Sequence, residues 1–424
     1  MTLFRSLVVF FGLLHSAAAH AEPHGSIDAS VALDQQTQKV LHAIVDGDWA
    51  TANSDAKKLN RRFPDYALGK LLYAETLQVA AGLSLKHNSE QRFSLNYISL
   101  LLEAQARAAQ PSAVAGTFTA NSASGNNYTD SNNTTRLPAA VIRTGSTIDH
   151  VILIDLKRSY LMLFDTSIDQ PRLVKRHYVA SGLGGYDKRF EGDLKTPIGV
   201  YNIHGFRSDR SLPKLYGSGA LMLDYPNSLD KMLGRSGSGI WLHGVPHDQK
   251  SRSPRSSEGC VTMANDYLLE LHHTVDLQAT RVVLSDKIHW ITPSLLASKQ
   301  EQQINLFERY RQAWTDLNIS ALHVLYNDGA WPLAAEQHGL NANLKRVSQV
   351  NQTTPSKARS KHAHTLSKVT SDTLAVIEVP GTNGVVQMSF RHGDKNEIQT
   401  TLYWGQLSDG SWQIIQERSL DSGI

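Results

Sequence analysis

The sequence predicts a multidomain protein with an N-terminal α-helical region, a mostly-β central domain and a C-terminal α+β domain. At 424 residues the chain is too long for one hydrophobic core. Apolar residues recur every three or four positions near the N-terminus and every second position from His150 onward. After Pro293 a helical pattern is followed by short alternating segments, which are separated by Asn-Gly and Asp-Gly turn signals.

Residues 1–21 are predicted to be an export signal. Arg5 precedes the apolar run Leu7–Leu14, and the small residues that end in Ala19-His20-Ala21 complete the pattern of a cleavable signal peptide. A membrane anchor is the weaker alternative, because this apolar run is too short to span a bilayer comfortably. We therefore expect cleavage before Glu22 and a periplasmic mature protein without a membrane span.

Residues 28–110 are predicted to be helical, with Gly47 and Pro64 as breaks and a last helix over Leu95–Ala109. The segment "GDWATANSDAKKLNRRFPDYALGKLLYAETL" resembles one helical hairpin of the tetratricopeptide kind, and one unit does not support a repeat array. Residues 111–147 follow as a predicted flexible linker. Up to about residue 136 they are rich in Ser, Thr, Asn and Gly and poor in large apolar side chains.

The apolar period of two assigns residues 148–286 to the mostly-β domain. Its only long helical pattern, "MANDYLLELHHTV", runs straight on from the segment that contains Cys260. Residues 296–424 are predicted to form the α+β domain. An amphipathic helix pair there is followed by the helical segment "AAEQHGLNANLKRVSQV", a basic polar loop and four antiparallel strands.

Composition and spacing exclude several functions. The net charge is +3 and the basic residues are scattered, which argues against nucleic-acid binding. His272 and His273 are adjacent on a predicted helix and therefore point to different faces, unlike a metal-binding pair. We predict no metal site and no cofactor.

Cys260 is the only cysteine in the sequence. Exported proteins mostly use cysteines in disulfide pairs, so a lone cysteine in this compartment suggests a chemical role. A thiol becomes an effective nucleophile when a base or a positive dipole assists its deprotonation. His243 follows the apolar strand "SGIWL" and is the candidate base, and an inert buried thiol is the alternative.

Two glycines suit acyl transfer at this cysteine. Gly259 leaves room beside the sulfur for a substrate carbonyl, and the N–H groups of Gly259 and Cys260 precede a predicted helix. We therefore expect them to form an oxyanion hole. Gly244 follows the histidine, and its backbone carbonyl is a candidate for orienting the imidazole.

Three ordered motifs resemble the catalytic domain of the L,D-transpeptidases, the YkuD-like family. They are the strands in "DHVILIDLKRSYLMLF", the stretch "GDLKTPIGVY" and the segment Ser257-Glu258-Gly259-Cys260 downstream of His243. The second matches the family's Gly-Asp-x-x-Thr-Pro-x-Gly pattern, and the third matches its Ser/Thr-His-Gly-Cys signature except at Glu258. The resemblance covers about Ile148–Asp286, a third of the chain.

The resemblance implies that Cys260 is the acyl-accepting nucleophile, His243 the general base and acid, and Gly244 the carbonyl that orients it. The implied substrate is the peptidoglycan stem tetrapeptide, which is attacked between meso-diaminopimelate and the terminal D-alanine to give a thioester. An amine acceptor makes the enzyme a transpeptidase, and water makes it an L,D-carboxypeptidase that leaves a tripeptide. A non-catalytic wall-binding scaffold is the alternative from another class.

The remaining site residues surround this pair. Ser257, Glu258 and Gly259 are assigned to substrate or oxyanion binding. A carboxylate at Glu258 is expected to raise the thiol pKa, and bonding to a backbone N–H or a substrate amine or simple exposure to solvent are the other options. Tyr225 is expected to line the cleft, and Arg235 to hold a substrate carboxylate.

The aromatic positions of the C-terminal domain resemble a nuclear-transport-factor-like domain, which joins the catalytic domain in a subgroup linked to cell shape. Four aromatic residues carry this weaker resemblance: Trp314, Tyr326, Trp404 and Trp412. It implies other cell-wall proteins as partners of the C-terminal domain, in addition to the stem peptides that meet the catalytic domain.

Overall fold

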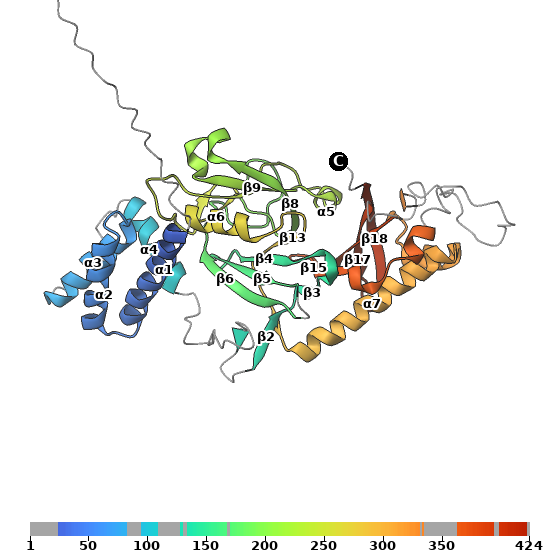
Figure 1. Ribbon diagram of the computed structural model, residues 1–424, viewed down its shortest axis with the longest axis horizontal. Helices are drawn as coiled ribbons and strands as arrows, with labels where there is room; N and C mark the ends of the chain where they lie inside the picture. The colour runs from blue at the N-terminus through green and yellow to red at the C-terminus, as the bar shows by residue number, and fades with distance from the viewer. Residues whose placement is uncertain are drawn as a thin grey trace, which may run out of the picture.

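The computed structural model describes residues 24–82, 95–108, 128–129, 134–167, 170–330, 333–334, 363–393 and 398–421. The predicted signal peptide, most of the predicted linker and the helix predicted near residues 334–350 lie outside these ranges. The described parts form a row, with the N-terminal helices at one end, the central sheet in the middle and the C-terminal sheet at the other end (Figure 1). Among the described residues, no helix is long and apolar enough to cross a membrane.

The described residues of the N-terminal region form four helices. They are α1 (His24–Val45), α2 (Trp49–Arg62), α3 (Ala67–Ala80) and α4 (Leu95–Ala108). Asp48 caps α2 by accepting a hydrogen bond from the backbone N–H of Thr51, which satisfies one free donor of the first turn. The helices bury a common apolar cluster that includes Val40, Leu59 and Leu68. The predicted helical region is thus confirmed, and its likeness to a tetratricopeptide hairpin stays a prediction.

The central domain is built on an eight-stranded sheet with the strand order β12-β10-β9-β8-β13-β4-β5-β6. The pairs β4–β13 and β10–β12 are parallel, and the other neighbours are antiparallel. The strands are β4 (His150–Asp155), β5 (Tyr160–Asp165), β6 (Arg172–Tyr178), β8 (Gly199–Ser208), β9 (Gly219–Leu223), β10 (Trp241–His243), β12 (Val261–Thr262) and β13 (Thr280–Ser285).

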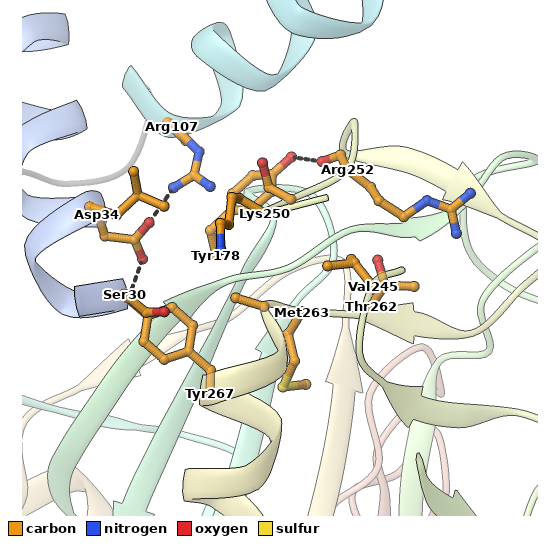
Figure 2. A pocket seen from close by; sticks show the side chains of 13 residues that line it. Ser30, Asp34, Arg107, Tyr178, Val245, Lys250, Arg252, Thr262, Met263 and Tyr267 are labelled. Atoms are coloured by element: carbon orange, nitrogen blue, oxygen red, sulfur yellow. Dashed lines mark hydrogen bonds and ion pairs between the residues drawn. The ribbon is translucent and has the colours of Figure 1, made fainter. Parts of the chain in front are cut away.

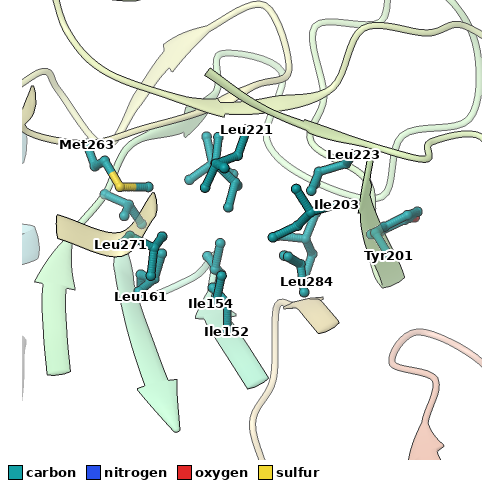
Figure 3. Close-up of a cluster of buried hydrophobic side chains, with 14 of the residues drawn as sticks. Ile152, Ile154, Leu161, Tyr201, Ile203, Leu221, Leu223, Met263, Leu271 and Leu284 are labelled. Carbon is teal, nitrogen blue, oxygen red and sulfur yellow. The ribbon is translucent and has the colours of Figure 1, made fainter. Parts of the chain in front are cut away.

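The sheet curves around one apolar core. Alternate residues of its strands point inward, among them Ile152, Leu161, Leu221 and Leu284, and these side chains face one another in Figure 3. Helix α6 (Asn265–Thr274) adds Leu271 to the same core. Residues between the inward-facing ones lie on the outer face of the sheet, and that face carries the candidate site.

In the described residues, the C-terminal unit is a five-stranded antiparallel sheet that packs against helices. Its strand order is β18-β17-β16-β15-β3, and its helices are α7 (Pro293–Thr315) and α8 (Ile319–Leu325). The four later strands are β15 (Ala375–Glu378), β16 (Val385–His392), β17 (Ile398–Gln406) and β18 (Trp412–Asp421). Trp314, Tyr326 and Trp404 lie in the core between the helices and the sheet.

The end of the predicted linker is structured. Residues 135–138 form β2 (Thr135–Pro138), which pairs with β14 (Trp290–Ile291). Strand β3 (Val141–Arg143) pairs with β15 and so completes the C-terminal sheet. The reason is apolar burial, because Leu137, Val141 and Ile142 are almost completely buried. The low-complexity composition that predicts a linker stops before these residues.

Candidate active site

Cys260 and His243 lie on the same face of neighbouring strands. In the parallel pair β10–β12, Leu242 lies opposite Val261, and both point into the inner core. His243 and Cys260 each adjoin one of these residues, so both side chains point to the outer face. His243 lies opposite Thr262, so Cys260 and His243 are offset by two residues along this pair, on one face of strands about 4.8 Å apart.

The imidazole of His243 is held as a neutral base. Its Nδ1 atom lies 2.7 Å from the backbone oxygen of Gly244, which can only accept, so Nδ1 carries the proton and Nε2 has the free lone pair. Burial lowers the pKa of His243 to about 4, although the bond to Gly244 acts in the opposite direction. The ring of Tyr216 packs against it edge-on, at 4.8 Å between centroids.

Asn265, at the start of α6, fixes the segment that carries Gly244. Its side-chain nitrogen donates to the Val245 oxygen at 2.8 Å, and its side-chain oxygen accepts from the Ser218 N–H at 2.9 Å. A Cβ atom on Gly244 would collide with this same oxygen. The glycine therefore lets the orienting carbonyl approach its anchor, a role that the sequence reasoning about Gly244 did not include.

Cys260 is a protonated thiol in the resting site. Its Sγ donates to the Gly239 oxygen at 3.3 Å. Burial raises the pKa of Cys260 to about 11, a hydrogen bond from the Trp241 backbone lowers it, and the charge of Glu258 raises it further. With the imidazole pKa near 4, the pair rests as thiol and neutral imidazole rather than as an ion pair.

The turn before Cys260 differs from the expected oxyanion hole. The Gly259 N–H donates to Ser257 Oγ at 3.2 Å, and Ser257 Oγ donates to the Cys260 oxygen. Strand β12 follows Cys260, and α6 begins only at Asn265, so no helix starts at the cysteine. The helix predicted over "MANDYLLELHHTV" is α6, which begins two residues into that stretch, and parallel pairing with β10 keeps the backbone extended through Thr262.

Gly259 is required by the backbone geometry of this turn. Its φ of +130° is disfavoured for residues with a side chain, and an added Cβ would lie 2.8 Å from the Lys195 oxygen. Thr196 Oγ1 donates to the Gly259 oxygen at 2.9 Å and thereby ties the turn to the segment "GDLKTPIG". The role of that segment in holding the cysteine turn was not predicted, although its motif was noticed.

A buried ion pair joins Asp193 of this segment to Lys188. Lys188 Nζ lies 2.7 Å from Asp193 Oδ1, with both side chains almost inaccessible. Burial tends to raise the pKa of Asp193, but hydrogen bonds from Lys188 and from backbone N–H groups lower it to about 2. The Lys188 charge partly offsets the effect of Glu258 on the thiol. Sequence reasoning missed Lys188, for which no motif gave a signal.

The other three predicted site residues differ in burial and in hydrogen bonding. Arg235 is 6 % exposed, and its NH1 donates to Asp230 at 2.8 Å and to the Ile198 oxygen at 3.0 Å. Tyr225 is buried and donates to the Ser236 oxygen. Glu258 is exposed, and within the described chain its side chain has no hydrogen bond or ion pair. Contact of these residues with substrate stays a prediction.

The loop between His243 and Cys260 touches the N-terminal helices. Ser251 donates to the carboxylate of Glu103 on α4 at 2.7 Å, and the Tyr178 hydroxyl donates to the Arg252 oxygen at 2.9 Å. Figure 2 shows Arg107 reaching from α4 to Asp34 on α1 beside this loop. The charge of Arg252 contributes to the low pKa of His243, so the loop acts on the site electrostatically.

Within the described chain, no three His, Cys, Asp or Glu side chains gather as metal ligands would. The site itself offers a thiol, an imidazole and backbone groups. Such a set is suited to attack on a carbonyl with transfer of the thiol proton to the histidine.

Known proteins resemble the chain in its central domain and in its fold. Residues 149–284 match the model of the L,D-transpeptidase catalytic domain, YkuD. The solved structure of Bdellovibrio bacteriovorus Bd1075 has 24% identity and a TM-score of 0.50, and the match covers 68% of this chain and 98% of that one. This likeness shows the fold alone.

The helical cell shape determining protein Pgp2 from Campylobacter jejuni has 23% identity and a TM-score of 0.46. That match covers 65% of this chain and 94% of Pgp2. No curated protein matches the sequence significantly. Residues 149–284 are therefore a catalytic domain of the L,D-transpeptidase family, YkuD.

Proposed function

We propose that the protein is an exported cysteine enzyme that cleaves peptidoglycan stem tetrapeptides between meso-diaminopimelate and D-alanine. The observation that carries this proposal is the thiol of Cys260 beside a neutral imidazole whose tautomer is set by Gly244. The periplasm is the proposed compartment, and remodelling of the cell wall with an effect on cell shape is the proposed role. The family of residues 149–284 supports the substrate class.

The first half-reaction releases D-alanine. Sγ of Cys260 attacks the carbonyl carbon of diaminopimelate as Nε2 of His243 accepts the thiol proton. The tetrahedral intermediate collapses, the peptide C–N bond breaks, and the proton on Nε2 passes to the leaving amine. The products are free D-alanine and a thioester on Cys260, and the imidazole is neutral again.

The second half-reaction decides the class of enzyme. An acceptor amine gives up a proton to His243 and forms a new amide, which is transpeptidation. Water gives up a proton in the same way and forms a carboxylate, which is L,D-carboxypeptidase activity that leaves a tripeptide. In both cases the C–S bond breaks and the proton returns from His243 to the thiolate.

We further propose that the C-terminal helices and sheet form a nuclear-transport-factor-like domain that meets other cell-wall proteins. The buried Trp314, Tyr326 and Trp404 support the fold but are not available as ligand contacts, since each is at most 2 % exposed. A scaffold without catalysis is the competing function. The intact hydrogen bond between His243 and Gly244 favours the enzyme.

The deciding experiment incubates the reduced mature protein with a disaccharide tetrapeptide. We expect release of D-alanine, and we expect Cys260→Ala to abolish it while the thermal unfolding curve stays close to that of the parent. Cross-linked dimers would identify a transpeptidase, and tripeptide alone a carboxypeptidase. Absence of product with every muropeptide, together with failure of a carbapenem to acylate Cys260, would leave the scaffold as the better explanation.

A further inference from the structure

A second polar cleft lies between the catalytic sheet and the C-terminal sheet. Its floor includes Asn202, Asp224 and Arg281 from the catalytic domain, and its opposite wall includes Arg391 and Arg418 from the C-terminal sheet. None of these residues takes part in the chemistry described above. The cleft therefore needs an explanation of its own.

Strand register places the basic residues on facing surfaces. On β13, Val282 and Leu284 point into the inner core, so Arg281 points outward from the sheet. In the C-terminal sheet, Thr401 lies opposite Arg418 and Gln399 lies opposite Arg391. All four are on the face that also carries Tyr403, which packs against the catalytic domain.

The cleft has more positive than negative charge. Arg281, Arg391, Arg418 and Lys231 line it, and Asp224 is its only carboxylate among the lining residues. Both oxygens of Asp224 accept hydrogen bonds from Asn202, at 2.8 and 2.7 Å. In the described part of the chain, none of the four cations forms an ion pair with a carboxylate.

Arg281 is the most unusual of these residues. It is 4 % exposed, and among the described residues its NH1 donates only to the backbone oxygens of Gln278 and Thr280 and its Nε has no partner. Burial lowers the pKa of Arg281 to about 10, Asp224 opposes this, and the nearby charge of Arg391 lowers it further. A buried guanidinium normally has a carboxylate partner, as Arg235 has in Asp230.

Gln387 adds an acceptor to the same cleft. Its side chain is 6 % exposed, and its Oε1 has no hydrogen-bond donor. A ligand that satisfied both Arg281 and Gln387 would carry negatively charged oxygens together with an N–H or O–H donor. Carboxylated peptides and phosphorylated sugars have this combination.

The cleft shares a face with the catalytic pair. Asn202 on β8 and His243 on β10 both point outward, and β9 is the only strand between β8 and β10. Cys260 precedes β12, which lies beyond β10, so three strand spacings, about 15 Å, separate it from β8, with a further offset along the strands. One extended polymer can therefore reach from the cleft to Cys260.

We propose that this cleft is a second substrate site, which binds an oxyanion-bearing group of the wall polymer while a stem peptide of that polymer lies at Cys260. The inference rests on the proposed function for its substrate class. Guanidinium groups from both sheets hold the anionic group, and the amide oxygen of Gln387 accepts from a neighbouring donor. Wall peptide and phosphate-bearing wall polymer are the two sources of such a group.

The test follows the Nε–H signal of Arg281 by NMR in the Cys260→Ala protein, with the signal assigned from Arg281→Lys. The probes are the stem tripeptide and inorganic phosphate. We expect at least one probe to shift the signal in a saturable way. We expect Arg391→Gln with Arg418→Gln to weaken that binding by about tenfold or more. Arg309→Gln, on the exposed side of α7, is the matched control and should leave the affinity unchanged.

The two probes separate the sources. A response to tripeptide alone identifies wall peptide, and a response to phosphate alone identifies a phosphate-bearing polymer. No saturable shift with either probe at millimolar concentration overturns the proposal, as does equal affinity in the double variant. Because the Cys260→Ala protein cannot turn over, this result is independent of D-alanine release, and either proposal can fail without the other.

Discussion

The N-terminal helices meet the catalytic domain through charged and polar side chains, whereas the C-terminal sheet meets it largely through apolar ones. On the N-terminal side, Arg107 pairs with Asp34 and Glu103 and lies over the Tyr178 ring at 4.1 Å. On the C-terminal side, Ile377 belongs to one buried cluster together with Leu153 of the catalytic sheet.

The apolar and the charged contact differ in how sensitive they are to small movements and to pH. An apolar contact tolerates small changes of position and is insensitive to pH, because its stability scales with buried area. A buried charge needs every partner in place, because an unpaired one costs several kcal/mol. The C-terminal unit is thus built as a permanent part of the catalytic domain, and the N-terminal contact responds to conditions and reaches the active-site loop.

The largest expected effect is at the apolar contact. Ile377→Ala removes a side chain that is 2 % exposed and leaves a cavity between the two sheets. We expect the free energy of unfolding to fall by about 2–5 kcal/mol. Chemical denaturation measures this. Val324→Ala on α8, where the side chain is 65 % exposed, is the control and should change stability by less than about 0.5 kcal/mol. Similar losses for both variants would contradict a shared core.

A smaller and more local effect is expected from Glu103→Gln. This change removes the carboxylate that Ser251 and Arg107 share, and it leaves the buried Arg107 with Asp34 alone. We expect a loss of about 1–3 kcal/mol, together with faster amide hydrogen exchange in residues 245–256. Asp55→Asn is the matched control, since its pair with Lys58 lies at the surface. Unchanged exchange in the loop would show that the helices do not hold it.

Acidification is expected to lower the free energy of unfolding through the contact between the N-terminal helices and the catalytic domain. This is the smallest of the three expected effects. The rings of His177 and Tyr267 stack with 3.8 Å between their centroids, and burial lowers the pKa of His177 to about 4. Because the folded pKa lies below the unfolded value, stability is complete above about pH 6.5 and is lost as pH falls toward 4. At pH 5.5 the loss is about 1 kcal/mol from this residue.

Denaturation at several pH values measures this slope. We expect it to decrease in His177→Gln, and the same change at the exposed His247 should leave it as it was. His243 is also buried with a low pKa and adds its own share, so some slope remains in the His177 variant. An unchanged slope in that variant would argue against a pH-sensitive N-terminal contact.

Patterns in the sequence predict the elements of the fold well, because period and turn residues are local properties. The strands around His150–Asp165 and the helix pair near Trp314 form where their apolar periods indicate. The pairing of Cys260 with His243 is also predictable, since a strand-end histidine and a motif cysteine identify it. The hydrogen bond from Gly259 to Ser257 is not, because it depends on one side-chain rotamer in a turn.

Contacts between residues far apart in the sequence cannot be predicted from local patterns. Lys188 with Asp193, and Glu103 with Ser251, are polar pairs whose members look like ordinary surface residues in the sequence. Only the folded arrangement removes them from water. The same holds for the cleft around Arg281, where residues from β8, β13, β16 and β18 come together.

Strand β3 makes the C-terminal unit discontinuous in sequence. The catalytic domain is inserted between β3 and the rest of its sheet, and Arg143 donates to the Ser371 oxygen across 228 positions of chain. During synthesis from the N-terminus, β3 has no pairing partner until β15 has been made, late in the chain. Closing so long a loop is slow, so the sheet edge of β15 is expected to be completed late in folding. A chain that includes β3 but stops at the end of the catalytic domain would leave β3 as an unpaired strand.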